Sequence, residues 1–212
     1  MIRAVIFDMD GVLSDTERLH VQSEEHLLSR LGIDPGVLAS GAYVGITDRE
    51  FFTSVFRSHG VVADVDAAIA EKWALIDKCP DDAIVAMPGA LALVDRLHGR
   101  GLPLAVASSS PRAFIERVLR CLGVRDQFGV VISGAEVARS KPEPDVFLAA
   151  ARALGVAPRE CVVIEDSKNG VAAARRAGMR CVAVVPTGGD GGEADIVVGD
   201  LAALTEETLL GR

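Results

Sequence analysis

Residues 2–11 read Ile2-Arg-Ala-Val-Ile-Phe-Asp-Met-Asp-Gly11, and this stretch decides which fold the sequence predicts. Its first six residues, 2–7, are mostly apolar and partly β-branched, which is typical of a strand buried on both faces. Asp8 and Asp10 follow directly, at the carboxyl end of the predicted strand, where open α/β sheets bind their ligands. The stretch therefore predicts an α/β fold with a functional site at one edge of its sheet.

Three later segments are short apolar runs of the same kind, at residues 102–107, 161–164 and 181–185. Continuous apolar runs of this length indicate further strands that are covered on both faces. Because such strands form parallel sheets between layers of helices, we expect a parallel sheet here.

Helical patterns lie between these runs. One is expected to begin at Ser110-Pro111, with the serine as N-cap and the proline in the first turn, and to end at Gly123. Others are predicted over residues 145–154, capped by Asp145, and over residues 168–177. From residue 89 on, helix and strand alternate, which predicts a doubly wound, Rossmann-like parallel sheet.

Residues 15–82 interrupt this alternation with helix signals and no convincing strand. Two capping boxes, Ser14-Asp-Thr-Glu17 and Thr47-Asp-Arg-Glu50, each precede apolar residues at helical spacing. A third helical pattern covers residues 69–76. We therefore predict two domains: an α/β core of residues 1–14 and 83–212, and an inserted helical-bundle cap of residues 15–82.

The balance of charge limits the classes of partner. The chain has 30 acidic residues against 22 basic ones, a net charge of −8. A protein that binds nucleic acid or an anionic membrane usually presents a basic face, so neither is expected as the main partner. The apolar run at residues 4–7 is too short for a signal-peptide core, and no stretch approaches the roughly 20 apolar residues of a membrane span.

Cysteine usage indicates the compartment. The four cysteines form no C-x-x-C pair, and we expect them to be buried free thiols, as in a reducing cytoplasm. We therefore expect a cytoplasmic protein that acts on a small molecule, as a monomer or a small homo-oligomer.

A second acidic pair, Glu165-Asp166, ends the run at residues 161–164 as Asp8 and Asp10 end the first run. If the two strands are neighbours, these carboxylates converge, and they repel one another unless a proton or a cation lies between them. Hard oxygen ligands in this number suit Mg²⁺. The sequence therefore predicts a magnesium site.

Two further features indicate a phosphate site. Ser108 ends another apolar run beside a predicted helix N-terminus, where hydroxyls and unpaired amides can hold a phosphate. Lys141 lies in the proline-stiffened segment Ser140-Lys-Pro-Glu-Pro144 and could neutralise the charge of a phosphoryl group.

Four segments, in this order, resemble the motifs of the haloacid dehalogenase (HAD) superfamily. They are Asp8-Met-Asp-Gly-Val-Leu-Ser-Asp-Thr-Glu17, the strand end at Ser108, Lys141-Pro-Glu-Pro-Asp145 and Glu165-Asp-Ser-Lys-Asn-Gly170. The ordered set, with a helical insert between the first two motifs, is specific although each motif alone is weak. Within the superfamily the chain is similar to β-phosphoglucomutases and phosphoglycolate-phosphatase-like proteins, which carry a small helical cap.

The resemblance implies a mechanism. Asp8 would be the nucleophile that forms an aspartyl-phosphate, and Asp10 the general acid and then the general base. Mg²⁺ would be held by Asp8, the Asp10 backbone carbonyl and Asp166, with Glu165 supporting the site. The groups that would bind the phosphoryl oxygens are Ser108, the Ser109 amide and Lys141.

The resemblance also assigns the cap a role in binding substrate. The cap is expected to lie over the acidic site, with a hinge that excludes water. Thr16 and His20 on the first cap helix would face the site, and they match positions that serve hinge and acid–base control in β-phosphoglucomutase-like proteins. Arg49, in the first turn of the second cap helix, matches an arginine that binds the far phosphate of the substrate there.

Other cap and loop residues are less defined by the resemblance. Lys72 and Lys78 are candidates for a cap lysine that helps the mutases. The glycine-rich segment 187–192 is predicted to be a flexible connection.

Two fates of the aspartyl-phosphate stay open. A phosphatase passes it to water, and a β-phosphoglucomutase-type mutase passes it to a sugar hydroxyl. We favour a Mg²⁺-dependent phosphatase of a small phosphorylated metabolite such as a sugar phosphate. A dehalogenase would need neither Asp10 nor the pair Glu165-Asp166, and a non-catalytic binding protein would be expected to lack a motif residue.

Overall fold

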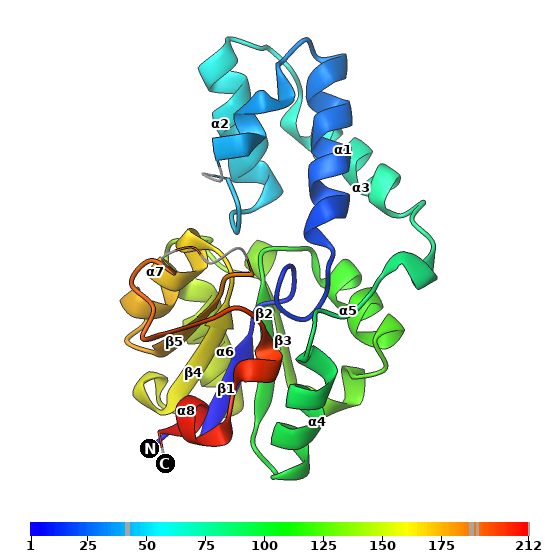
Figure 1. Ribbon diagram of the computed structural model, residues 1–212. Coiled ribbons are helices and arrows are strands. Elements are labelled where there is room, and N and C mark those ends of the chain that lie inside the picture. The colour runs from blue at the N-terminus through cyan, green and yellow to red at the C-terminus, as the bar shows by residue number, and fades with distance from the viewer. Residues whose placement is uncertain (41–42, 187–188, 190, 212) are drawn as a thin grey trace.

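The computed structural model describes residues 1–40, 43–186, 189 and 191–211 (Figure 1). Of the glycine-rich segment predicted as a flexible connection, residues 187, 188 and 190 lie outside the described part. No helix among the described residues is long and apolar enough to cross a membrane.

The core is a sheet of six parallel strands in the order β3-β2-β1-β4-β5-β6. The strands are β1 Ala4–Phe7, β2 Leu104–Ser108, β3 Val130–Ser133, β4 Cys161–Glu165, β5 Arg180–Val184 and β6 Ile196–Val198. This is the doubly wound strand order of Rossmann-like folds, so the predicted fold class is confirmed.

The register of β1 with its neighbours determines where the site forms. Phe7, the last residue of β1, lies opposite Ile164 in β4 and opposite Val106 in β2. The segments that follow these three strands therefore leave the same edge of the sheet, side by side.

Helices cover both faces of the sheet. They are α4 Ala90–Gly99, α5 Arg112–Cys121, α6 Asp145–Leu154, α7 Lys168–Arg176 and the short α8 Glu206–Leu210. Successive residues of β1 alternate between the two cores: Phe7 packs in the one with α4 and α5, and Ile6 in the one with α6 and α7. Both faces of β1 are thus buried, as its continuous apolar sequence requires.

The insert after β1 forms a helical cap over the carboxyl edge of the sheet (Figure 1). It contains α1 Glu17–Arg30, α2 Asp48–His59 and α3 Val65–Ile76, with a 3-10 helix at Pro35–Ser40. Apolar side chains from all three helices form a separate core, including Leu27, Phe52 and Ala68. The cap therefore has a core of its own, although Leu19 of α1 and Ile76 of α3 pack in the core that contains Phe7.

The two segments that connect cap and core run alongside each other. Ser14 bridges to Ala86, and the amide of Asp15 donates to the carbonyl of Val85 at 3.0 Å. Shorter 3-10 helices occupy other connections, at Asp81–Ala83, Arg125–Gln127, Gly134–Glu136, Pro158–Glu160 and Leu201–Ala203.

Three predicted helix caps are wrong. The N-cap of α1 is Thr16 and makes no side-chain cap bond, while the Ser14 hydroxyl donates to the carbonyl of Val85. The N-cap of α5 is Pro111 rather than Ser110. Asp145 is the first residue of α6, and its carboxylate is paired with Arg139. In each case a tertiary partner binds the side chain that the local pattern assigned to the helix end.

Other local predictions divide similarly. The capping box of Thr47 and Glu50 at the start of α2 is confirmed.

Strands β3 and β6 were not predicted, because β3 alternates in burial and β6 is short and only partly buried. All four cysteines are free, but Cys79 and Cys121 are only partly buried, so the prediction of burial is wrong for those two.

Candidate active site

A pocket lies between the carboxyl edge of the sheet and the inner face of the cap. Core residues Asp8, Asp10 and Lys141 line one side, and cap residues, including Glu24 and Lys72, line the other. Each core side chain follows a strand or lies in a loop at this edge, so the sheet topology brings together groups that are far apart in the sequence.

Three carboxylates meet at the core side of the pocket, two of them buried and that of Asp166 partly exposed. Asp8 follows β1, whereas Glu165 ends β4 and Asp166 follows it, and one carboxylate oxygen from each lies within 4.8 Å of the others. The chain at Gly11 approaches them closely, because a Cβ there would lie 2.0 Å from Asp166 Oδ2. The predicted convergence of the two acidic strand ends is therefore present.

Lys141 is the cation of this cluster. Its side chain is 1 % exposed, and Nζ donates to Asp8 Oδ1 at 2.7 Å and to Glu165 Oε1 at 2.6 Å. Burial alone would lower the pKa of this ammonium, but the two carboxylates raise it above its usual value. Lys141 is thus held charged beside the proposed nucleophile.

The same environment disfavours the charged form of Asp8. Burial, followed by the charges of Glu165 and Asp10, raises the pKa of the Asp8 carboxyl to about 8, although Lys141 acts to lower it. Asp166 likewise has its pKa raised well above its usual value, first by burial and then by Glu165 and Asp8. One ammonium does not offset the charge of three neighbouring carboxylates.

The donor set fits a divalent cation with a preference for oxygen. Asp8, Glu165 and Asp166 offer only carboxylate oxygens, which lie close together and are mostly buried. A positive charge between them would remove the repulsion that raises the pKa of Asp8 and Asp166. Mg²⁺ takes ligands of this chemistry.

Glu165 is held mainly by the chain around it. Its Oε2 accepts from the amides of Asp166 and Ser167, at 2.9 and 2.7 Å, and from the Ser167 hydroxyl at 2.9 Å. Gly170 leaves room for this carboxylate, because a Cβ there would lie 1.8 Å from Oε1. Glu165 is therefore suited to fixing Lys141 in place.

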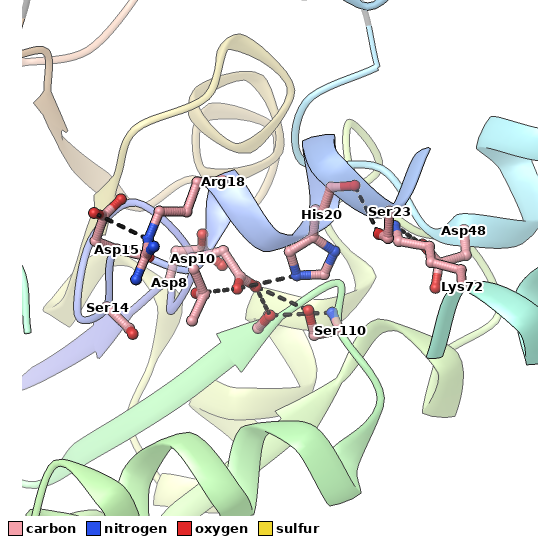
Figure 2. Close-up of polar contacts among 12 residues, drawn as sticks. Asp8, Asp10, Ser14, Asp15, Arg18, His20, Ser23, Asp48, Lys72 and Ser110 are labelled. Carbon is pink, nitrogen blue, oxygen red and sulfur yellow. Dashed lines mark hydrogen bonds and ion pairs between the residues drawn. The ribbon is translucent and has the colours of Figure 1, made fainter. Parts of the chain in front are cut away.

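Asp10 faces the cap rather than the carboxylate cluster. Its Oδ1 accepts from the Thr16 hydroxyl at 2.5 Å and lies 3.3 Å from His20 Nε2, and its Oδ2 accepts from Ser110 at 2.8 Å (Figure 2). Burial opposes ionisation, but the charge and hydrogen bond of His20, together with the two hydroxyls, lower the pKa of Asp10. Asp10 is therefore an ionised carboxylate in this state.

His20 is the partner in this ion pair. Burial and the neighbouring Lys72 lower the pKa of its imidazole, but Asp10 raises it and the net effect is a raised pKa. The ring also packs edge-on against Trp73 and Phe114. The position of His20 is thus determined from both domains.

The serines at the end of β2 contact both Asp10 and the cap. Ser108, predicted to bind phosphate, directs its hydroxyl to Asp10 Oδ2 at 3.2 Å and accepts from the amide of Ser110. The Ser109 hydroxyl donates to the carbonyl of Gly45 in the cap at 2.6 Å. Ser110, assigned by its sequence to a helix cap, is a ligand of Asp10 that the sequence interpretation missed.

The cap side of the pocket holds a second charged group. Lys72 on α3 is 2 % exposed and donates to Glu24 on α1 at 2.6 Å and to Asp48 on α2 at 2.5 Å. Asp48 also accepts from the Trp73 indole at 2.6 Å. Glu24 follows His20 by four residues on the same helix, a spacing that could have identified it as pocket-lining.

Arg49 and Lys78 are not brought to the pocket. Arg49 matches an arginine that binds the far phosphate of the substrate in similar proteins, but its side chain here is 63 % exposed and pairs with Asp66 at the start of α3. Neither residue is among those that line the pocket. The cap lysine at the site is Lys72.

Comparison with known proteins identifies the family. Residues 2–178 match the family of haloacid dehalogenase-like hydrolases. The fructose-1-phosphate phosphatase YqaB of Escherichia coli strain K12 is 34 % identical over 85 % of this chain and 95 % of its own. The crystal structure of β-phosphoglucomutase from Clostridium difficile superimposes with a TM-score of 0.86 at 28 % identity, over 98 % of this chain and 95 % of that one.

A longer relative contains a similar domain. The protein SUPPRESSOR OF QUENCHING 1 of Arabidopsis thaliana is 37 % identical over 88 % of this chain, which spans only 18 % of that protein's length. The family match covers residues 2–178, which include all the carboxylates of the site and Lys141. The chain belongs to the haloacid dehalogenase-like hydrolases.

Proposed function

We propose that this protein is a Mg²⁺-dependent phosphatase that hydrolyses a small phosphorylated metabolite, a sugar phosphate, through an aspartyl-phosphate on Asp8. The observation that carries the proposal is the contact of the Lys141 ammonium with Asp8, 2.7 Å, inside a cluster with Glu165 and Asp166. A carboxylate attacks a phosphate anion only where positive charge offsets their repulsion. Lys141 supplies part of that charge, and Mg²⁺ held by the carboxylates would supply the rest.

In the first step the Asp8 carboxylate attacks phosphorus, an O–P bond forms, and the ester O–P bond breaks. Lys141 orients the carboxylate through Oδ1. Asp8, Asp166 and the backbone carbonyl of Asp10 would hold Mg²⁺, with Glu165 beside them. The ion would supply charge that stabilises the phosphoryl oxygens. The Ser109 amide and Lys141 are proposed to bind those oxygens.

The leaving oxygen needs a proton, and the geometry indicates its source. His20 Nε2 lies 3.3 Å from Asp10 Oδ1, and the raised pKa of the imidazole favours the form that carries a proton there. A phosphoryl group beside Asp10 adds negative charge and so raises the pKa of that carboxyl. The proton then passes from His20 to Asp10 and on to the leaving oxygen. In the second step Asp10 takes a proton from a water molecule whose oxygen bonds to phosphorus, and the O–P bond to Asp8 breaks, which releases phosphate and restores the carboxylate.

A mutase of the β-phosphoglucomutase kind is the second candidate. The full-chain similarity to β-phosphoglucomutase favours it, and so does the buried cap lysine Lys72. We favour hydrolysis because water is the default acceptor of an aspartyl-phosphate, and the similarity to a fructose-1-phosphate phosphatase supports this choice. We also propose that the protein is cytoplasmic and acts as a monomer or a small homo-oligomer.

One pair of assays tests this proposal. Phosphate release is measured over sugar phosphates, phosphoglycolate and nucleotides, with and without Mg²⁺. Conversion of β-glucose 1-phosphate is measured in parallel, with a bisphosphate activator. Faster phosphate release than conversion, dependent on Mg²⁺, is expected. Faster conversion would replace the phosphatase with the mutase, and no reaction in either assay would contradict both.

A further inference from the structure

The cap end of the pocket contains a group of three charged side chains that the proposed chemistry does not use. Glu24 from α1, Asp48 from α2 and Lys72 from α3 form this cap triad, with Lys72 Nζ between the two carboxylates. Figure 2 shows Lys72 and Asp48 beyond His20, on the side away from Asp8 and Asp10. All three residues line the same pocket as Asp8. The triad therefore lies where the part of a substrate distant from its reacting phosphate would be.

The charges of the triad do not cancel. One ammonium is shared by two carboxylates, so the group carries one net negative charge when all three are ionised. Burial would lower the pKa of Lys72, but Asp48 and Glu24 raise it, so the ammonium stays charged. Glu17, a further acid, also lines the pocket.

Other cations do not change this balance. Among the described residues that line the pocket, the remaining cations are His20 and Lys141, and each is already paired with core carboxylates. Arg49, the residue expected to bind a far phosphate, is outside the pocket and paired with Asp66. The cap end therefore has no unpaired positive charge for a second phosphate group.

Hydroxyl groups fit this environment well. An ammonium has three N–H donors, and two of those on Lys72 are used by Glu24 and Asp48, so one is left for a hydroxyl oxygen. The carboxylates can accept hydrogen bonds from neighbouring hydroxyls. A second phosphate would bring two negative charges against a group that is already negative.

We propose, on the basis of the phosphatase function above, that Glu24 and Asp48 determine specificity: they select monophosphates of a polyhydroxylated molecule and reject bisphosphates. Lys72 and the two carboxylates bind the hydroxylated end, while the phosphate lies at Asp8. A mutase of the β-phosphoglucomutase kind has to hold a sugar bisphosphate, so this selectivity also favours hydrolysis.

The test compares D-fructose 1-phosphate with D-fructose 1,6-bisphosphate, which differ only by the second phosphate. The wild-type protein is expected to have a kcat/KM at least about tenfold higher for the monophosphate. Glu24→Gln removes one charge but keeps the shape and a hydrogen-bond acceptor. It should reduce this preference about tenfold, mainly through a lower KM for the bisphosphate. Asp48→Asn should act in the same direction.

Two controls separate selectivity from general damage. Glu25→Gln removes the same charge from an exposed position on the same helix and should leave the preference unchanged. Hydrolysis of p-nitrophenyl phosphate, which has no hydroxylated end, should be equal in wild type and Glu25→Gln. A wild-type protein that prefers the bisphosphate would overturn the proposal, and so would a preference that neither Glu24→Gln nor Asp48→Asn reduces.

Equilibrium binding distinguishes failure of this inference from failure of the proposed function. The dissociation constants of both fructose phosphates are measured by calorimetry with the Asp8→Asn protein and Mg²⁺. If wild type hydrolyses none of the esters, the phosphatase function is wrong. The role of the triad would still be supported if the protein binds the monophosphate more tightly than the bisphosphate and Glu24→Gln reduces that difference. Equal binding of the two ligands would overturn it.

Discussion

The hydroxyl of Thr16 donates to Oδ1 of Asp10 at 2.5 Å, so the last residue before the first cap helix is bonded to the proposed acid–base group of the core. Together with His20 and Ser110, this bond lowers the pKa of Asp10. Cap position and the protonation state of Asp10 are therefore linked by a direct contact.

Replacing Thr16 should uncouple the position of the cap from the protonation state of Asp10. Thr16→Val keeps the shape of the side chain but removes the hydrogen-bond donor, so the pKa of Asp10 should rise. The kcat for a small phosphate ester should fall about tenfold, which is a fraction of the rate that general acid–base catalysis supplies. Thr16→Ser restores the hydroxyl and should recover most of the activity. The measurement is kcat against pH for the three proteins, and identical profiles would contradict the linkage.

Asp8→Asn should abolish turnover, by about a thousandfold or more, because an amide cannot form the acyl-phosphate. The fold should persist, since the substitution is isosteric and removes a carboxylate whose pKa burial has raised to about 8. Phosphate release and the circular dichroism melting curve report the two effects. Retained turnover in a folded protein would exclude Asp8 as the nucleophile.

Mg²⁺ should stabilise the protein and be required for activity. At a concentration about 100 times its Kd, a ligand specific for the folded state adds about 2.7 kcal/mol, which appears as a higher Tm. Asp166→Asn should remove most of this increase, whereas Asp126→Asn, at an exposed site, should not. A chelator should stop phosphate release. An unchanged Tm on adding Mg²⁺ would count against a metal at these carboxylates.

Gly170→Ala should disturb Glu165, because the new Cβ would lie 1.8 Å from Oε1 of that carboxylate. Displacing Glu165 disrupts a contact of Lys141, so we expect a loss of about 1–3 kcal/mol in the free energy of unfolding and lower kcat. Gly99→Ala adds a methyl in open space and should cost little. Urea unfolding of both variants provides the comparison, and a fully stable, active Gly170→Ala protein would show that Glu165 can move freely.

The buried cysteines should resist alkylation in the native protein. Burial raises the pKa of Cys161 to about 11 and that of Cys181 to about 12, so few reactive thiolates exist at pH 8. Modification would increase only as the pH rises toward these values. Mass spectrometry after iodoacetamide treatment should find Cys79 labelled first, and all four labelled in guanidinium. Rapid labelling of Cys181 at pH 8 in the folded protein would contradict the burial of β5.

Patterns of neighbouring residues predicted much of this protein. Apolar runs such as residues 161–164 identified the buried strands, because covering a strand on both faces requires apolar side chains throughout. Acidic residues directly after two such runs identified Asp8 and Asp166 as candidates for the pocket. These predictions depend on positions within a few residues of each other along the chain.

Contacts between distant segments were decided only by the tertiary structure. Ser110 and Ser14 have the local pattern of helix caps, but folding brings Asp10 and the Val85 carbonyl within reach of their hydroxyls. Arg49 and Lys72 are both cations of the cap, and helix packing alone determines that one meets Asp66 in solvent while the other is buried in the pocket. The sequence by itself determined the buried strands β1, β2, β4 and β5 and the acidic edge of the sheet, because burial and strand period act locally. Which charges face the substrate depends on the packing of α1, α2 and α3, which no local pattern encodes.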